Sequence, residues 1–434
     1  MKIVIHRGID QIGGCITVIS TAHTKIIIDL GSNLPGSKGR EFTKQEIENI
    51  TKDADGIYYT HFHGDHVGLS SLVPDNITQY IGEGAREVNI CKYTVLASHE
   101  SKYKRDLMVA QNMKTYEEAR RYNVGKKGEI YITPFFVDHS AFNSYMFLIE
   151  VFLIEAGKKY RILHTGDFRG HGYLSKGLLK ILQAKAQNVD ILITEGTMLS
   201  RLDEKVDHEY TIKTGAVKLL KEEKRPHYLF ALCSSTDMDR LASFHAACKE
   251  TGAKFLCDKY QKSVLDIFTK HAAKHSELFN FDDDTTVVLG EECDFDKDLR
   301  PNGFIMPVRA SSQLDFVKKM LYYFPNAELI YSIWKGYYLG TEEQKNKNVI
   351  DFVNLFHGQY HYLHTSGHAD VKTLEDVCRI TNPSIGVIPI HKDKNTRYEN
   401  LSVADVVNVI SKTTTIDDLE IRIEENKKIG GTGF

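Results

Sequence analysis

The sequence lacks any pair of cysteines at the spacing of a zinc ribbon. Its seven cysteines are odd in number and scattered, and none forms a CxxC pair: they are Cys15, Cys91, Cys233, Cys248, Cys257, Cys293 and Cys378. This pattern indicates neither a zinc ribbon nor a secreted disulfide framework. Reduced thiols are the simplest interpretation, and they are typical of a cytoplasmic protein.

The sequence also lacks a long hydrophobic run. The N-terminal residues Met1–Arg7 enter a strand pattern directly, without the apolar region of a signal peptide. The most apolar stretch, 146–154, is too short to span a bilayer and is interrupted by Glu150. We therefore expect a cytoplasmic protein with no membrane partner.

Net charge is a third feature of which the chain has little. Its formal value of -3 provides no global attraction to nucleic acid, although a local basic groove would suffice for binding. The composition, 42% hydrophobic and 26% charged, is typical of a globular protein, and 434 residues are enough for two to three domains or one large elaborated domain. The 19 histidines are an excess, and they do not form a tract.

The first part of the chain alternates short strand patterns with glycine-rich turns. A buried strand over 26–29 ends at Asp29, and Tyr145–Ala156 with Tyr160–His164 has the spacing of a hairpin. We predict helices over 42–53, 83–97 and 115–122. This arrangement favours two sheets packed face to face and covered by helices.

The character of the sequence changes after residue 205. Tyr228–Leu232, Leu241–Thr251 and Lys254–Leu256 form a strand–helix–strand pattern, which is typical of a separate α/β unit. We therefore divide the chain into a first domain over 1–205 that resumes at 346–434, and an inserted unit over 206–345.

One stretch places several metal-ligand side chains close together. His61, His63, Asp65 and His66 lie within six positions, immediately after an apolar strand pattern. Imidazole and carboxylate groups are ligands for zinc, and less often for iron or manganese. Four such groups do not fit one closed tetrahedral site with room for chemistry, so they favour halves of two adjacent metal sites.

Three further segments have an apolar strand that ends in an acid or a histidine. They carry Asp138 with His139, His164 with Asp167, and His391. Taken singly, such residues more often have structural roles, as capping groups or hydrogen-bonded side chains.

Together these residues resemble the ligand set of the metallo-β-lactamase superfamily of binuclear metal hydrolases. The resemblance implies that His61, His63 and His139 hold one metal, that Asp65, His66 and His391 hold the other, and that Asp167 bridges them. It also implies that Asp29 supports the metal loop. Flavodiiron relatives carry an acid at the position of His63, so we expect two Zn²⁺ ions, with Mn²⁺ as an alternative.

A second group of motifs resembles the nucleic-acid-processing β-CASP branch, and ribonuclease J-type proteins in particular. Glu195 follows the bridging aspartate, and the segment from His364 to Ala369 matches an H-x-S-G-H-A motif. The resemblance implies a metallo-β-lactamase αββα sandwich (α/β or α+β class) with an inserted α/β β-CASP domain. The implied site residues are His368, Glu195, Asp65 and Asp29 for catalysis, and His364, Ser366 and Gly367 for substrate phosphate.

Some positions depart from the ribonuclease J pattern. Lys392 and Asp393 follow the last metal ligand, where a Gly-Glu pair is usual, and the insert has no G-x-Q-G-E-P-like segment. The chain ends at Phe434, which leaves no room for the C-terminal domain of ribonuclease J. These departures concern substrate binding rather than the metal ligands.

We therefore expect a metal-dependent phosphodiester hydrolase that acts on nucleic acid, with RNA ahead of DNA. Two alternatives stay open: a hydrolase of a small ester, lactone or thioester, and a nucleic-acid-binding pseudoenzyme. Endonucleolytic and exonucleolytic cleavage are not distinguished, and a homo-oligomer is compatible with the sequence.

Overall fold

The computed structural model divides the chain into two compact units. Unit 1 comprises Met1–Gly170, Leu174–Lys205 and Gly367–Phe434, and unit 2 comprises His171–Tyr173 and Val206–Ser366. The structure describes residues 1–34, 37, 39–202, 204, 206–222, 227–290, 293–398, 401–403 and 407–424. Within these ranges, no helix is both long and apolar enough to cross a membrane.

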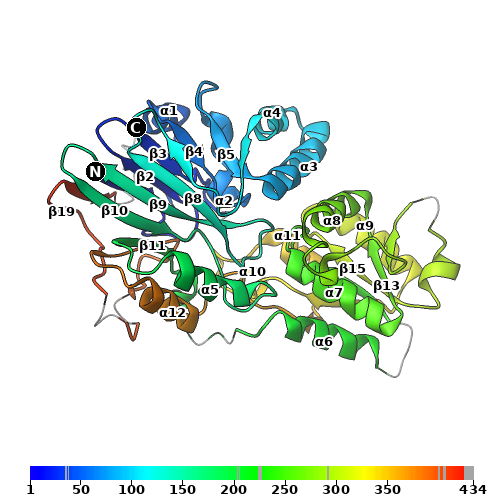
Figure 1. Cartoon of the computed structure of the whole chain (residues 1–434). Helices are drawn as coiled ribbons and strands as arrows, with labels where there is room; N and C mark the ends of the chain where they lie inside the picture. Colours follow the sequence, from blue (N-terminus) through cyan, green and yellow to red (C-terminus); the bar gives the residue numbers. More distant parts are fainter. Residues whose placement is uncertain are drawn as a thin grey trace, which may run out of the picture. The chain divides into compact units, whose positions relative to one another are not determined.

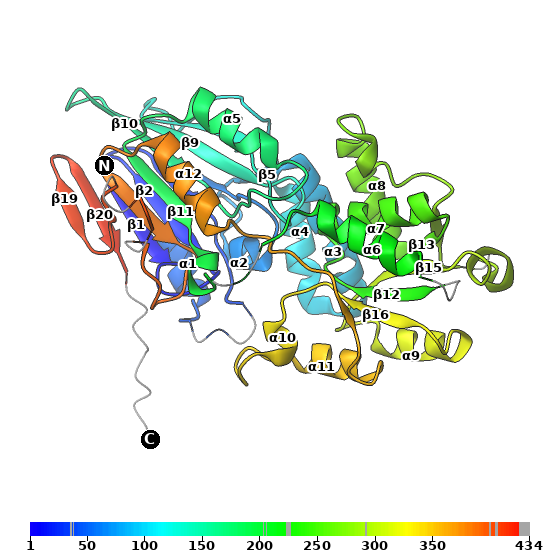
Figure 2. The same ribbon diagram turned by 90° about the horizontal axis from the view of Figure 1, so that it is seen from below.

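The first sheet of unit 1 has eight strands in the order β19-β20-β1-β2-β3-β4-β5-β6. Figure 2 shows the C-terminal hairpin β19–β20 beside β1, with which β20 pairs in parallel. The strands are β1 (Lys2–Arg7), β2 (Ile16–Ser20), β3 (Lys25–Ile28), β4 (Gly56–Tyr58), β5 (Gln79–Gly82), β6 (Lys114–Tyr116), β19 (Thr414–Ile416) and β20 (Leu419–Ile423).

The second sheet of unit 1 has six strands in the order β18-β11-β10-β9-β8-β7. Strands β8, β9 and β10 are antiparallel neighbours, and β10, β11 and β18 are parallel, so β8, β10, β11 and β18 all run in one direction. The strands are β7 (Tyr122–Val124), β8 (Ile130–Phe136), β9 (Tyr145–Leu153), β10 (Lys158–His164), β11 (Ile191–Glu195) and β18 (Gly386–Ile390).

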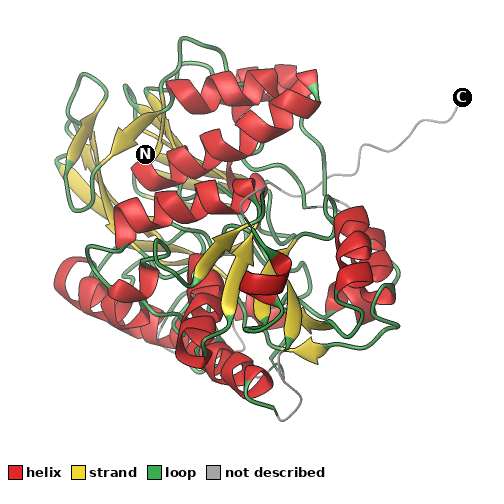
Figure 3. Ribbon diagram, turned by 90° about the vertical axis from the view of Figure 1, so that its right-hand side faces the viewer, coloured by secondary structure: helices red, strands yellow, loops and turns green. Residues whose placement is uncertain are grey.

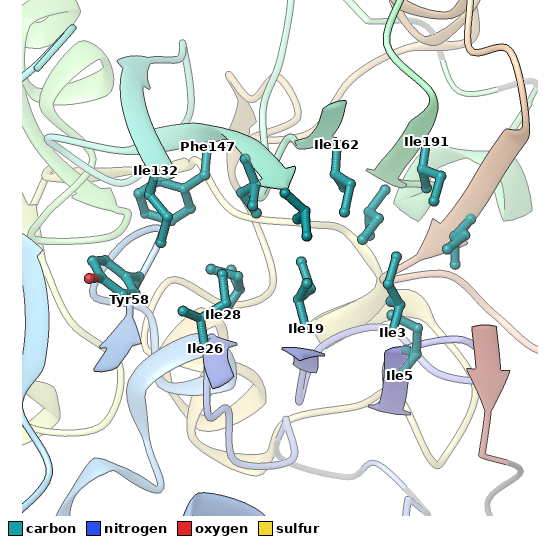
Figure 4. Close-up of a cluster of buried hydrophobic side chains, with 14 of the residues drawn as sticks. Ile3, Ile5, Ile19, Ile26, Ile28, Tyr58, Ile132, Phe147, Ile162 and Ile191 are labelled. Atoms are coloured by element: carbon teal, nitrogen blue, oxygen red, sulfur yellow. The ribbon is translucent and has the colours of Figure 1, made fainter. Parts of the chain in front are cut away.

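A core rich in isoleucine joins the two sheets of unit 1 (Figure 4). Ile26 and Ile28 of the first sheet belong to the same buried cluster as Phe147 and Ile162 of the second. The cluster takes alternate residues of β3, as expected when successive strand side chains point to opposite faces. The strands therefore form because each has one apolar face to bury against the other sheet.

Helices cover the outer faces of this sandwich. Leu182 of α5 and Leu374 of α12 pack with Leu148 and Leu163 in a second buried cluster, and Figure 1 shows α5 and α12 on the same side. The helices of unit 1 are α1 (Lys44–Thr51), α2 (Gly64–Val67), α3 (Glu83–His99), α4 (Lys104–Asn112), α5 (Ser175–Lys185) and α12 (Val371–Thr381), with short η1 (Ser70–Leu72), η2 (Ser101–Tyr103) and η3 (Thr197–Ser200). The expected sandwich of helix-covered sheets is confirmed.

The helix predicted over 115–122 is wrong. The segment contains the end of β6 and the start of β7. Tyr116 is buried and its hydroxyl donates a hydrogen bond to the Tyr59 carbonyl at 2.6 Å, while Ala119 has a positive φ of 58°, which no helix tolerates. Sheet pairing and burial therefore override the local charge pattern that resembled a helix.

Unit 2 is an α/β unit with a six-stranded parallel sheet in the order β14-β13-β15-β12-β16-β17. Its strands are β12 (Tyr228–Leu232), β13 (Lys254–Cys257), β14 (Thr286–Val288), β15 (Phe304–Val308), β16 (Glu328–Tyr331) and β17 (His361–Tyr362). Its helices are α6 (Tyr210–Leu220), α7 (Met238–Thr251), α8 (Lys259–Ala272), α9 (Leu314–Tyr323), α10 (Gly336–Leu339) and α11 (Lys347–Asn354), with the 3₁₀ helix η4 (Glu277–Phe279) and the short π-helix η5 (Phe295–Leu299).

Helices pack against the sheet of unit 2. Figure 3 shows helices (red) alongside strands (yellow). Val317 of α9 and Phe352 of α11 pack on Phe230 and Met306. The ring of His245 in α7 meets the ring of Phe255 edge to face, with the ring centroids 5.5 Å apart. Unit 2 ends at Ser366 in the structure, beyond the residue 345 expected from the sequence. The extra residues include β17, which completes the sheet.

We predict that Phe147→Ala lowers the free energy of unfolding of unit 1 by about 3–5 kcal/mol, because the ring is fully buried between the sheets. Tyr322→Ala is the control, since Tyr322 is 85% exposed and its loss should change stability by less than about 0.5 kcal/mol. Denaturant unfolding measures both, and equal stabilities would contradict the packing described.

Candidate metal centre

The ligand-type residues of unit 1 lie at the carboxyl ends of its strands. His139, Asp167, Glu195 and His391 follow or end β8, β10, β11 and β18, whose carboxyl ends share one edge of the second sheet. His61 to His66 follow β4 of the first sheet. Ligand sites in α/β proteins form at such edges. Residues separated by up to 330 positions are thereby brought together.

The first group consists of His61, His63 and His139. One nitrogen from each ring lies within 4.8 Å of the others. His139 Nδ1 is 2.7 Å from the carbonyl oxygen of Gly367, which only accepts, so Nδ1 carries the proton and donates. His61 Nδ1 is 3.0 Å from the hydroxyl of Thr60, whose proton goes to Asp29, so this Nδ1 also donates.

These hydrogen bonds decide where the lone pairs lie. Burial is the main cause that holds the pKa of His61 and of His139 well below the ordinary value, so both rings are neutral. With Nδ1 protonated, the free lone pair is on Nε2. Among the described residues, His61 Nε2 and His139 Nε2 are buried without a hydrogen-bond partner. Two buried lone pairs beside a third imidazole fit a bound metal ion.

The second group consists of Asp65, His66, Asp167 and His391, again within 4.8 Å of one another. Asp167 Oδ2 is 3.1 Å from His66 Nε2 and 3.2 Å from His391 Nε2. Asp65 Oδ2 is 3.0 Å from His391 Nε2. All four side chains are buried, and two carboxylates with two imidazoles fit a second divalent cation.

The carboxylates and imidazoles of the second group shift each other's pKa values strongly. Burial would lower the pKa of His66, but Asp167, Asp29 and Asp65 raise it well above its ordinary value. Burial would raise the pKa of Asp167, but His391 and His66 lower it well below its ordinary range. Without a metal, protonated imidazole therefore neutralises the carboxylates, and a divalent ion would take over that role.

Asp29 supports this group from behind. Its carboxylate accepts from His66 Nδ1 at 2.8 Å, from the Thr60 amide at 2.7 Å and from the Thr60 hydroxyl at 2.9 Å. Asp29 and the ligand His391 both adopt positive φ, 60° and 50°, a conformation that non-glycine residues rarely adopt. An outer partner of this kind orients an imidazole ligand and fixes its tautomer.

Glu195 and His368 form a pair beside the second group. His368 Nδ1 is 3.1 Å from Glu195 Oε2, and Asp167 Oδ2 lies 3.8 Å away from the same nitrogen. Glu195 is buried and also accepts from the amides of Phe168 and Ala369 at 3.3 and 3.1 Å. The carboxylate thus orients the ring of His368, which is partly exposed.

The residues assigned to phosphate binding divide between the units. His364 and Ser366 lie in unit 2, where Arg240 Nη1 is 3.4 Å from His364 Nδ1 and the Ser366 carbonyl accepts from His171 Nε2 at 2.6 Å. Gly367 lies in unit 1 and its carbonyl orients His139. Their role in binding phosphate stays a prediction.

Two residues that the sequence analysis did not assign contact the ligands directly. The Thr197 hydroxyl is 2.7 Å from His391 Nδ1 and 3.2 Å from His368 Nδ1. Thr60 joins Asp29 to His61, as described above. Threonine in a turn after a strand has many ordinary roles, so neither residue stands out by its type. The nearness in sequence of Thr197 to Glu195 and of Thr60 to His61 was the only indication.

Cys15 is a third residue without an assignment. Its sulfur lies within 4.8 Å of a ring nitrogen of His66 and of His391, and the side chain is buried. Burial holds the pKa of this thiol well above its ordinary value. In the absence of a metal, Cys15 is therefore a protonated packing residue beneath the second group.

No protein-family model matches the sequence, and no curated protein was found to match it. The structure is similar to the crystal structure of a protein of unknown function from Enterococcus faecalis V583, with a TM-score of 0.68 and 16% identity over 94% of this chain and 97% of that chain. The similarity shows a shared fold.

Two metallo-β-lactamases are also similar, over less of the chain. A class B3 di-zinc enzyme from an Alaskan soil metagenome has 18% identity and a TM-score of 0.29 over 44% of this chain and 77% of that chain. One from Cronobacter sakazakii has 12% identity and a TM-score of 0.26 over 43% and 75%. These similarities are too low to carry an argument about this chain.

We predict that Thr197→Val weakens metal binding about 10–100-fold, because His391 loses the acceptor that fixes its tautomer. Thr197→Ser keeps the hydroxyl and should restore the affinity. Titration of the metal-free protein with Zn²⁺ measures both variants. Wild-type affinity in the valine variant would contradict the assigned role.

We also predict a pH effect on the metal-free protein. Burial lowers the pKa of His63 to about 4, so between pH 6.5 and 4 the unfolded chain binds a proton that the folded chain does not. This penalty is absent above pH 6.5 and grows as the pH falls toward 4, up to about 3 kcal/mol.

The variant His63→Gln removes that penalty. Its free energy of unfolding in a chelator should therefore change less than that of the wild type between pH 7 and pH 4. Denaturant unfolding at several pH values measures the difference, and parallel pH dependences would contradict it.

Proposed function

We propose that the chain is a binuclear metal-dependent hydrolase of the metallo-β-lactamase superfamily, from its β-CASP branch, that cleaves phosphodiester bonds of RNA. The observation that carries the proposal is the pair of buried, unpartnered Nε2 atoms of His61 and His139 beside the Asp–His group around Asp167. Zinc is the proposed metal, with manganese as the alternative, because the first group consists of imidazoles and the second of imidazoles and carboxylates.

The proposed roles follow from the contacts. His61, His63 and His139 would hold one ion, Asp65, His66 and His391 the other, and Asp167 would lie between them. Two bound ions would supply a hydroxide nucleophile at neutral pH and stabilise charge on the phosphate oxygens. Asp29 orients His66 through its Nδ1.

His368 is the proposed proton donor to the leaving oxygen. Its Nδ1 lies 3.1 Å from Glu195 Oε2, and Nε2 is the atom that we propose to meet substrate. Glu195 orients the ring through its contact with Nδ1, and the amides of Phe168 and Ala369 donate to the same carboxylate and hold it in place. His368 is partly exposed, as a residue that contacts substrate must be.

The choice of RNA rests on the inserted α/β unit and on the H-x-S-G-H-A segment from His364 to Ala369. A small substrate would not need a second folded unit. Three basic residues of unit 1 add little support for a nucleic-acid groove, because Lys102, Arg120 and Arg121 are each paired with a glutamate. The phosphate-binding role of His364, Ser366 and Gly367 belongs to this proposal.

A panel of substrates tests the proposal. The metal content of the purified protein is measured first, and the loaded protein is then assayed on 5′-phosphorylated RNA, single-stranded DNA, a generic phosphodiester and a small ester. Metal-dependent cleavage of RNA is the expected result. Hydrolysis of the ester alone would favour a small-molecule hydrolase, and metal binding without any hydrolysis would favour a pseudoenzyme.

We predict that His368→Ala reduces the rate of RNA cleavage about 10²–10⁴-fold with metal content and folding retained, because the ring provides a proton rather than a metal bond. His63→Ala should instead lose metal as well as activity. The exposed His275 provides the control, and His275→Ala should cleave RNA normally. Full activity of the His368 variant would refute the assigned role.

A further inference from the structure

A buried ion pair lies next to the metal centre without contributing a ligand. The Arg169 side chain donates from Nε to Asp138 Oδ1 at 3.0 Å, and the Arg169 amide donates to the Asp138 carbonyl at 2.6 Å. The two side chains are 0% and 1% exposed. One residue thus holds the other through both its backbone and its side chain.

The Asp138–Arg169 pair links the loop that follows β8 to the loop that follows β10, and each loop carries a candidate ligand. Asp138 immediately precedes His139 at the end of β8, and Arg169 follows Asp167 by two residues after β10. Strand β9 lies between β8 and β10 in the sheet. Strands two apart are separated by about 10 Å, so sheet pairing alone does not bring the two loops together.

A gain in folding stability does not explain why a fully buried ion pair is present here. Desolvating two charges costs about as much as their attraction returns, and apolar pairs of the same volume are often equally stable. A second buried pair, Glu209 with Arg240 in unit 2, has the same chemistry, with Nε to Oε1 at 2.6 Å. The side chain of Arg240 in that pair also donates to the Ser332 and Thr365 carbonyls of unit 2 rather than to the loops that carry His139 and Asp167, which makes the pair a comparison of similar chemistry.

We propose that the Asp138–Arg169 pair is a positioning device that sets the separation of His139 and Asp167, and thereby the separation of the two bound ions. His139 belongs to the first ligand group and Asp167 to the second. Loosening the link between their loops would let the groups move apart. The proposal depends on metal binding by the two groups and not on the identity of the substrate.

The test uses the full chain and measures metal rather than activity. Asp138→Asn and the control Glu209→Gln each convert the carboxylate of a buried pair into an amide of the same shape. Both should lower the Tm of the metal-free protein. Only Asp138→Asn should weaken binding of the ions, by about 10–100-fold, the usual effect of losing a partner behind a ligand.

Electron paramagnetic resonance of the Mn²⁺-loaded protein gives a second readout. Two Mn²⁺ ions that share a carboxylate are magnetically coupled, and the coupling depends on their separation. We expect a coupled signal in the wild type and in Glu209→Gln, and a weaker coupling in Asp138→Asn. A role in stability alone would leave the coupling unchanged.

The double variant Asp138→Leu/Arg169→Met covers the case in which the single variant does not fold. It removes both charges at similar volume, so it should fold with a near-wild-type Tm and still bind the ions weakly without normal coupling. Wild-type affinity and coupling in either Asp138 variant would overturn the proposal, and so would a double variant that cannot fold. A wild-type chain that binds no metal would overturn the proposed function as well.

Discussion

The structure depends above all on one constraint: carboxylates and imidazoles are buried beside an apolar sandwich core, where each charge needs a partner. Asp65, Asp167 and His66 lie at the edge of two sheets whose interior is almost entirely isoleucine and aromatic. Charges in such surroundings must be paired or must bind a metal. Here His66 and His391 lie between the carboxylates. The Nδ1 atoms of His66, His139 and His391 have partners outside the ligand groups, so their Nε2 atoms face the other ligands.

Strand direction turns this requirement into a site. Because β8, β10, β11 and β18 run the same way, residues from distant parts of the chain end at one edge. The groups behind the ligands then fix the details: Asp29 and Thr60 hold the first loop, Glu195 and Thr197 hold His368 and His391, and the Asp138–Arg169 pair ties two further loops. Chemistry at the edge would therefore be sensitive to residues that never touch a metal.

Several features of the fold were predictable because they follow from local patterns. The hairpin of β9 and β10 and the apolar strand before His61 match the alternation and turn residues of the sequence. The segment 115–122 was mispredicted, because the strand at its start arises from pairing with β5 and from burial of Tyr116, and the strand at its end arises from pairing with β8. The end of unit 2 at Ser366 was also missed, since β17 has only two residues and is defined by its neighbour β16.

The sequence by itself indicated the candidate ligands: His61 to His66 by their residue types and close spacing, and the more distant ones by strand-end positions whose combination resembles a known ligand set. The strand–helix–strand pattern after residue 205 also predicted a separate α/β unit. Only the tertiary structure decided which ring nitrogen of His139 and of His391 faces the other ligands, since that depends on partners of Nδ1 such as the Gly367 carbonyl and the Thr197 hydroxyl. The same holds for Cys15, Asp138 and Arg169, which acquire meaning only from the neighbours that folding places beside them.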